Sequence, residues 1–465
     1  MDESGLKKVL NRWDLVGLNI VAIVGLRWLL TSSAIGPSSI VLWLAAFAMF
    51  FIPQAFVVAE LSSSWPQQGG IYAWTKLAMG DAHGFIAGWC YWTNSFIYFP
   101  TLLFFLARNA AWMWGGDLPQ LYVTAASVAL LWAVAGASIL GLKTGRWFQN
   151  LGAAVTFIVA AMIIGFGLLS LNYHPPATEF SGFAPRGGMG TISFWSAMCF
   201  AFAGLELQSM MGGEIKNPKR SIPFAIVVAG LIVTVIYIAG TVALMLAVPN
   251  SEIDIIGGIP QAIASVASSA NIRFSSSVVA ALITVGGLGG VLAWFSGTAR
   301  IPFVAGLDRK LPASMGKLHR KFGTPHVAII AQASIVTALI IISSIGASLM
   351  EAYLTLVNAT IVLCFIPYLY MFASALILRS KMPDVKREVK MPLGDFGAGF
   401  FPSLGFITVL LAILLVFVYP GVIENRLVYE AKLIGITGFF VVTGVLVYYR
   451  EGIVKLIRRK SDNKS

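Results

Sequence analysis

The sequence predicts an all-α protein that crosses a membrane many times. Hydrophobic residues make up 58% of the 465 positions, charged residues make up only 11%, and the mean hydropathy is +0.82. A soluble core of this size does not require so much apolar sequence. In addition, twelve stretches are long enough to cross about 30 Å of hydrocarbon as helices. Two of those stretches carry a formal charge near their middles, which sets them apart from the other ten.

The twelve predicted spans follow one another with short connections. They begin near Asp14, Ser39, Ala82, Leu118, Gln149, Thr191, Ser221, Phe274, Pro325, Leu349, Ala398 and Val428. The longest polar connections, 299–324 and 379–397, are too short to form soluble catalytic domains. We therefore expect an N-terminal segment 1–13, spans one to five in 14–171, spans six to ten in 191–378, spans eleven and twelve in 398–449, and a tail 450–465.

The basic residues predict which way the chain is inserted. With the N-terminus placed inside, 26 of the 32 Lys and Arg residues fall in inner segments, five fall outside, and Arg27 lies within the membrane. This asymmetry predicts that both termini are cytoplasmic in a multi-pass protein of the cytoplasmic membrane. The net charge of +12 is then a consequence of topology, and the bilayer rather than nucleic acid is the expected partner.

Two charged residues mark spans one and six as special. Arg27 lies inside the apolar stretch 15–35, and Glu206 lies inside 194–213. A charge at bilayer depth costs about 2.5–3.5 kcal/mol even on a lenient insertion scale, so it is kept where it faces a cavity, a partner or a substrate path. Gly25 and Gly204 stand beside the two charges and disfavour regular helix. Two broken spans, five helices apart, predict two five-helix repeats with the last two spans outside the symmetry.

The loops that flank these spans carry longer motifs. Residues 60–74 read ELSSSWPQQGGIYAW, residues 214–223 read EIKNPKRSIP, and GTAR at 297–300 is followed by LP at 311–312 and GTP at 323–325. Together they resemble the amino acid, polyamine and organocation (APC) transporter superfamily, over nearly the whole chain through span ten. FIP at 51–53, GGIYAW at 69–74 and VPNSEI at 248–253 are most similar to its glutamate/gamma-aminobutyrate antiporter branch.

The resemblance implies a fold and a function. The expected fold is the LeuT type, in which ten core helices form two inverted repeats and the substrate is held between broken helices one and six. The expected function is secondary active transport of amino acids by alternating access, in the form of exchange. A polyamine or cationic amino-acid carrier is the alternative within transport. A membrane nutrient sensor or partner-bound subunit that does not translocate is the alternative of another class.

The chain departs from the family pattern in span one. Many members carry a Gly-Ser-Gly run whose backbone amides bind the substrate carboxylate at a half-helix N-terminus. Here Ala22, Ile23 and Val24 stand in that place, and Gly25 is the only glycine nearby. The amides are then more crowded, and Arg27 is the residue that could compensate, because a guanidinium can hold a carboxylate through two parallel hydrogen bonds. The alternative is that Arg27 forms a structural ion pair with Glu206.

Span six supplies the other predicted site residues. Glu206 is the last residue of the family pattern Gly-x-Glu. The resemblance implies that this residue acts in coupling or gating, with protons as a further partner. The alternative is that its carboxylate only caps the broken helix. The substrate-binding residues implied by the family pattern, besides those of span one, are Tyr91, Phe200, Phe202, Ala203, Gly204 and Trp294. For the aromatic residues, ordinary packing in the core is the competing interpretation.

Other residue types predict neither an enzyme nor a bound cofactor. Cys90, Cys199 and Cys364 sit in apolar spans without metal-type spacing, and the four histidines are scattered. The run of glycines at 286–290 lies inside a span without a preceding strand, so close helix packing is expected rather than nucleotide binding. No metal, cofactor or catalytic constellation is predicted, and no motif specifies an oligomeric state.

Overall fold

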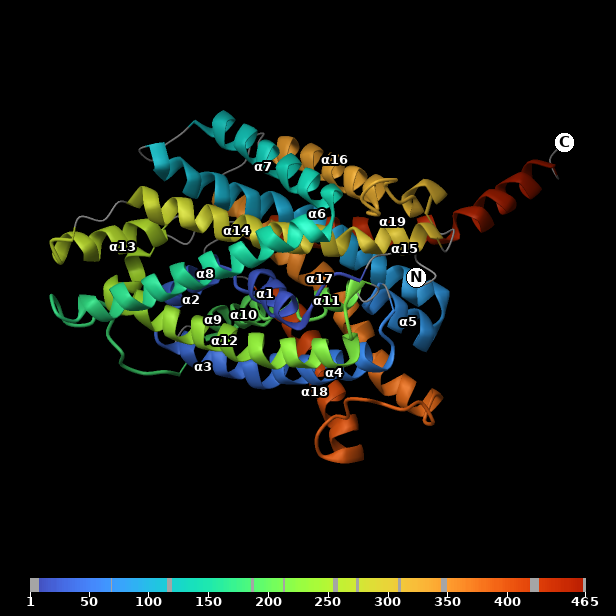
Figure 1. Cartoon of the computed structure of the whole chain (residues 1–465), viewed down its shortest axis with the longest axis horizontal. Coiled ribbons are helices and arrows are strands. Elements are labelled where there is room, and N and C mark those ends of the chain that lie inside the picture. Colours follow the sequence, from blue (N-terminus) through green and yellow to red (C-terminus); the bar gives the residue numbers. More distant parts are fainter. Residues whose placement is uncertain are drawn as a thin grey trace.

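The computed structural model describes residues 8–67, 69–114, 119–184, 188–211, 214–253, 258–272, 276–307, 311–343, 349–418 and 426–462. The regular elements in these ranges are helices, and an isolated parallel bridge joins Leu10 to Ile215. Most helices run along the long axis of the molecule, and the start of α1 and the end of α19 point to the same end (Figure 1).

The first half of the chain begins with a pair of short helices. Its elements are α1 (Arg12–Ile23), α2 (Leu26–Ile35), α3 (Ser38–Ala46), the π-helical turn η1 (Phe47–Phe51), α4 (Ile52–Ser64), α5 (Ile71–Met79), α6 (Asp81–Ala111), the 3₁₀ turn η2 (Trp112–Trp114), α7 (Gln120–Leu140) and α8 (Leu142–Ser170). The predicted start of span four at Leu118 lies outside the described residues, where α7 is first seen at Gln120.

The second half also begins with short helices. Its elements are α9 (Gly188–Ser193), α10 (Trp195–Ala201), α11 (Leu207–Met210), α12 (Pro218–Ala247), η4 (Asn250–Glu252), α13 (Gly258–Ser269), α14 (Ser276–Thr298), α15 (Arg300–Leu307), η5 (Ala313–Gly316), α16 (His326–Ser343), α17 (Leu349–Lys381), α18 (Gly394–Val416) and α19 (Arg426–Asp462). The predicted start of span eight at Phe274 lies outside the described residues.

Several helices have the length and apolar character of membrane spans. Within the described ranges eight helices meet both conditions, and α1 with α2, which are bent by 43° relative to each other, adds a ninth if the pair is one broken span. Thr191–Ala201 and His326–Ile342 are shorter apolar helices. The chain is therefore a multi-pass membrane protein, whereas the count of twelve spans stays a prediction.

Glycines let the central helices approach closely. α14 lies against α1, α6 and α8. A β-carbon at Gly290 would come within 2.5 Å of the Val21 carbonyl oxygen, and one at Gly286 within 2.8 Å of the Thr156 hydroxyl. Side chains at these positions would push the helices apart, so the glycine run serves close packing, as the sequence predicts. The contact places α14 directly behind the interruption between α1 and α2.

A buried ion pair closes the bundle at the end where α1 begins. The guanidinium of Arg300 lies 3.0 Å from the carboxylate of Glu214, and both side chains are buried. The Glu214 carbonyl accepts a hydrogen bond from Val9 N at 2.9 Å, and Lys216 N donates to the Leu10 carbonyl at 2.8 Å. These contacts tie the N-terminal segment, the entry to α12 and the start of α15 together.

Candidate substrate site

The first interruption separates α1 from α2. Helix α1 ends at Ile23, and the next two residues, Val24 and Gly25, have extended backbone with ψ near 100° before α2 begins at Leu26. A β-branched residue followed by glycine is a weak helix-forming pair, which accounts for the break at this point. The break leaves the carbonyls of Ala22 and Ile23 and the amide of Gly25 without partners inside a helix.

The second interruption separates α10 from α11 and faces the first. Helix α10 ends at Ala201, and residues 202–206 form turns before α11 begins at Leu207. Gly204 has a φ of +126°, which favours glycine. A β-carbon there would lie 3.2 Å from Ile23 Cγ1 and 3.2 Å from Trp294 Cζ2. The two breaks therefore lie against each other, at the positions that the sequence predicts.

One tyrosine hydroxyl connects both breaks. Tyr237 of α12 lies 2.5 Å from the Ile23 carbonyl oxygen and 2.9 Å from that of Ala201, and it accepts a hydrogen bond from the Gly25 amide at 3.2 Å. A hydroxyl has one proton to donate and two lone pairs to offer, so it can serve the two carbonyls alternately while it satisfies the amide. The indole of Trp43 stacks on the Tyr237 ring at 4.4 Å and holds it in place.

Glu206 is surrounded by hydrogen-bond donors. Its carboxylate accepts from the Tyr91 hydroxyl at 2.5 Å, from Gln54 Nε2 at 2.9 Å and from the Gly204 amide at 3.2 Å. The Tyr368 hydroxyl lies beside it and accepts from Gly204 N and Gln54 Nε2. Three donors thus converge on this carboxyl group, and the bond from the Gly204 amide caps the broken helix.

Arg27 lies in the first turn of α2 and does not pair with Glu206. Its side chain is only 2% exposed, and its guanidinium lies 4.4 Å above the Trp28 ring and 5.0 Å from the Tyr98 ring. The nearest hydrogen bond is a long one of 3.5 Å to the Thr101 hydroxyl, and Nε has no partner. Among the described residues no carboxylate lies within ion-pair distance of this guanidinium. Arg27 is therefore a buried cation with an unused hydrogen-bond donor at Nε.

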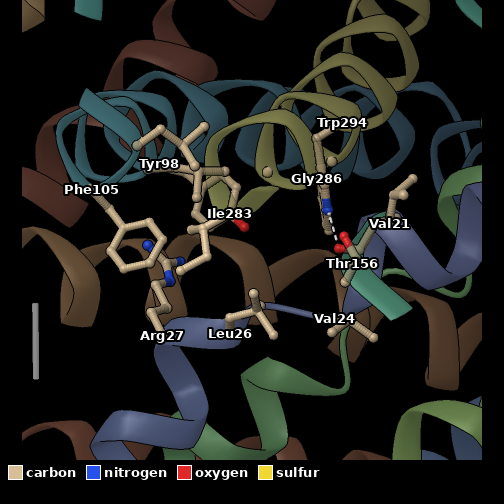
Figure 2. Close-up of a pocket in the computed structure, with 16 residues that line it drawn as sticks. Val21, Val24, Leu26, Arg27, Tyr98, Phe105, Thr156, Ile283, Gly286 and Trp294 are labelled. Carbon is tan, nitrogen blue, oxygen red and sulfur yellow. Dashed lines mark hydrogen bonds between the residues drawn. The ribbon is translucent and has the colours of Figure 1, made fainter. Parts of the chain in front are cut away.

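A small cavity of about 40 Å³ lies between the first break and helices α6, α8 and α14. Figure 2 shows Arg27, Leu26 and Val24 on one side of it and Trp294, Gly286 and Ile283 on the other. The dashed bond in this view is donated by the Trp294 indole to the Ala22 carbonyl at 2.6 Å. The volume suffices for a few water molecules and is too small for an amino acid, so the described residues around this cavity leave no room for a substrate.

The predicted site residues fall into two groups. The cavity is lined by Val24, Gly25, Arg27 and Trp294. The others lie around this lining: the Tyr91 ring stacks on Trp294 at 6.1 Å, and Phe200 meets Trp28 edge to face at 5.8 Å. Ile23 and Gly204 form the meeting point of the two breaks, and the amide of Ala203 in the second break donates to the Phe200 carbonyl. Phe202 points elsewhere, because its ring packs on Trp43, Phe51 and Tyr237.

Four polar residues of the site were not predicted from the sequence. Gln54, Tyr237 and Tyr368 complete the hydrogen bonds of the breaks, and Tyr98 shields Arg27. The available signal was weak: a lone tyrosine or glutamine in an apolar span needs a polar partner when it is buried. The sequence does not say which of the thirteen tyrosines finds its partner at a break.

Two interrupted helices that meet inside a bundle of apolar helices, with a buried cation beside the first interruption, are typical of membrane transport proteins of the broken-helix type. Residues 10–443 match the model of the amino acid permease family. The chain belongs to this family, which confirms the resemblance to the APC superfamily. Its fellow members are transporters rather than enzymes.

Individual relatives are similar over most of their length. An uncharacterized transporter of Legionella pneumophila is 31% identical over 442 residues, which is 92% of this chain and 94% of the relative. A probable agmatine/putrescine antiporter of Lactococcus lactis is 21% identical and covers 82% of each chain. A glutamate/gamma-aminobutyrate antiporter of the same species is 23% identical, over 86% of this chain and 82% of the relative.

Proposed function

We propose that the protein exchanges amino acids across the cytoplasmic membrane by alternating access, and that Arg27 binds their carboxylate. The observation that carries the proposal is a buried guanidinium without a carboxylate partner among the described residues, at the edge of the cavity beside the first break. A charge at this depth in the bilayer is energetically costly, and charged residues that are retained there usually have a function. Guanidinium never loses its proton and matches a carboxylate in geometry.

The local backbone supports the same ligand. Helix α2 starts at Leu26, so its positive end faces the cavity from the same side as Arg27. Gly25 is a lining residue, and a β-carbon there would lie 2.7 Å from the Trp28 indole, so a side chain at this position would displace the ring that packs on Arg27. The described lining residues include no carboxylate to pair with an ammonium group, whereas Arg27 offers a positive charge to a carboxylate. A ligand with an α-carboxylate therefore suits this cavity better than a polyamine.

Transport requires the chain to open on each side in turn. The two interruptions are five predicted spans apart, and each half also inserts a short helix after its second span, α5 in one and α13 in the other. Both features support two related five-helix units that move against each other, as in the LeuT type. The Arg300–Glu214 pair and the N-terminal segment would separate when the chain opens towards the cytoplasm.

Glu206 is the proposed coupling residue. Its carboxylate joins the second break to α4 and α6 through Gln54 and Tyr91, so a change in its charge would loosen three elements at once. Glu206→Gln places an amide donor against groups that all donate. We expect exchange by the wild type to change between pH 5 and 8 in liposomes, and exchange by this variant to be slower and independent of pH over the same range.

Counterflow in liposomes tests the substrate. Purified protein is reconstituted with unlabelled acidic, neutral or cationic amino acids, agmatine or putrescine inside, and uptake of the same labelled compound is followed. Amino acids should drive counterflow, and agmatine and putrescine should not. Arg27→Ala should reduce exchange by about 10- to 100-fold, the loss expected for one charge-assisted contact of ~1.5–3 kcal/mol. Arg27→Lys should recover part of it, and Lys317→Ala in an exposed loop is the matched control.

The alternatives predict different results in the same assay. Counterflow of agmatine or putrescine with full activity of Arg27→Ala would instead make the protein a polyamine carrier, like the probable agmatine/putrescine antiporter to which it is similar. Saturable amino-acid binding without any counterflow would indicate a sensor or a subunit of a larger assembly. Unchanged amino-acid exchange by Arg27→Ala would remove the carboxylate role of this residue.

A further inference from the structure

The connection between α17 and α18 encloses a second, much larger cavity. Its volume is about 700 Å³, and it lies between one apolar span that ends at Lys381 and another that begins at Gly394. Since both spans end here, the cavity lies at the level of a membrane surface. Figure 1 shows this orange part of the chain projecting from the main body of helices. The cavity is remote in sequence and structure from the broken helices.

Positive charge dominates the lining. The basic side chains are Arg379, Lys386, Arg387 and Lys390, and the lining contains a single carboxylate, Asp395. The two arginines are held by the buried carboxylate of Glu60, with Nε of Arg379 at 3.1 Å and Nε of Arg387 at 3.4 Å from Oε1. Four basic side chains thus face two carboxylates, and the remaining positive charge is carried by the lysines.

The two lysines are available to a ligand. Lys386 and Lys390 are both exposed, and within the described part of the chain neither has a carboxylate within 4.0 Å. Glu388, between them in the sequence, is engaged at 3.3 Å by Lys219. The N-terminal end of α18 also opens into the cavity at Gly394, and a helix N-terminus favours an anion.

Large apolar side chains continue from the mouth of the cavity. Leu393 is 68% exposed and Phe396 is 69% exposed, and the Phe396 ring stacks on that of Phe400 at 5.5 Å. Further along α18 the exposed side chains Ile407, Leu411 and Leu414 extend the apolar surface. A free phosphate ion would use only the charged part of this surface. A phospholipid would use both parts, its phosphate beside the lysines and its acyl chains along α18.

We propose that this cavity binds the headgroup of an anionic phospholipid, with the phosphate held between Lys386 and Lys390. Basic pockets between transmembrane helices are suited to such headgroups, because the anionic leaflet attracts lysines near the surface. The bound lipid would join α17 to α18 at the point where Glu60 already anchors α4 to the same loop. The site stands apart from the proposed transport cavity and does not depend on the substrate.

Lipid binding by the purified full-length protein tests the site. The delipidated protein is titrated with phosphatidylglycerol or with phosphatidylcholine of the same chain length, and bound lipid is counted by native mass spectrometry. Phosphatidylglycerol should bind more tightly. Lys386→Gln combined with Lys390→Gln should weaken its binding by about thirtyfold, since each basic residue near an anionic surface contributes about fivefold. Both side chains are exposed, so the variant should elute and unfold like the wild type.

Matched controls separate the possible results. Lys317→Gln combined with Arg320→Gln removes the same charge from another exposed loop and should leave binding within about twofold of the wild type. Inorganic phosphate at tenfold excess should not displace the lipid. The proposal would be overturned if both lipids bound equally well or if the control variant lost as much binding. Displacement of the lipid by phosphate alone would also overturn it, because the site would then be one for the free ion.

Discussion

Tyr237 shows how much one side chain can contribute to a broken membrane helix. In hydrocarbon there is no water to satisfy the free backbone groups of a break, so the protein must supply partners. The Tyr237 hydroxyl supplies them to the carbonyls of Ile23 and Ala201 and to the Gly25 amide, while the Trp294 indole serves the Ala22 carbonyl. The breaks persist because neighbouring helices complete their hydrogen bonds.

Tyr237→Phe tests whether the hydroxyl oxygen stabilises the two interrupted helices. The substitution keeps the ring that stacks on Trp43 and removes the hydroxyl, which leaves buried backbone groups without a partner at a cost of about 1–3 kcal/mol. We expect a lower apparent Tm of the purified protein. Tyr173→Phe, at an exposed loop position, should leave the Tm unchanged. Equal Tm values for the two variants would contradict the role given to the hydroxyl.

The two interrupted helices depend on a backbone conformation as well as on polar partners. Gly204 combines a φ of +126° with neighbours on both sides, Ile23 from the first break and Trp294 from α14. Any side chain at this position would strain the backbone and push the two breaks apart. The interruption between α10 and α11 therefore requires a residue without a side chain at position 204.

Gly204→Ala should accordingly destabilise the protein and abolish exchange. A non-glycine residue in such a conformation costs about 1–3 kcal/mol, and the 3.2 Å contacts add to that. Gly165→Ala is the control, because Gly165 lies inside α8 with open space around it, where alanine suits a helix better than glycine. Thermal unfolding and counterflow are measured for both. A Gly204→Ala protein as stable and active as the control would refute the close fit of the breaks.

At the scale of the whole molecule, the chain must have one orientation in the bilayer. The distribution of basic residues predicts that the loop after span eight is cytoplasmic and the loop after span five is external. The three native cysteines, Cys90, Cys199 and Cys364, are buried and should give little background with a thiol reagent. Single introduced cysteines can therefore report the orientation.

We predict opposite labelling of two introduced cysteines in intact cells. Tyr173→Cys, in the loop after α8, should react with a membrane-impermeant maleimide. Lys317→Cys, in the loop before α16, should react only after the membrane is made permeable. The reverse pattern would place both termini outside and would invert the proposed direction of opening.

The sequence determined the class of protein, the place of both breaks and the two charged residues at them, because apolar length, glycine and intramembrane charge act locally. Only the tertiary structure decided their partners. In the folded protein Arg27 does not pair with Glu206, whose carboxyl group accepts hydrogen bonds from Tyr91 and Gln54 instead. The Phe202 ring packs on Trp43 and does not face the cavity. The physical reason is that a hydrogen bond between residues more than a hundred positions apart depends on how helices pack, and the pattern along one helix does not record which neighbour it meets.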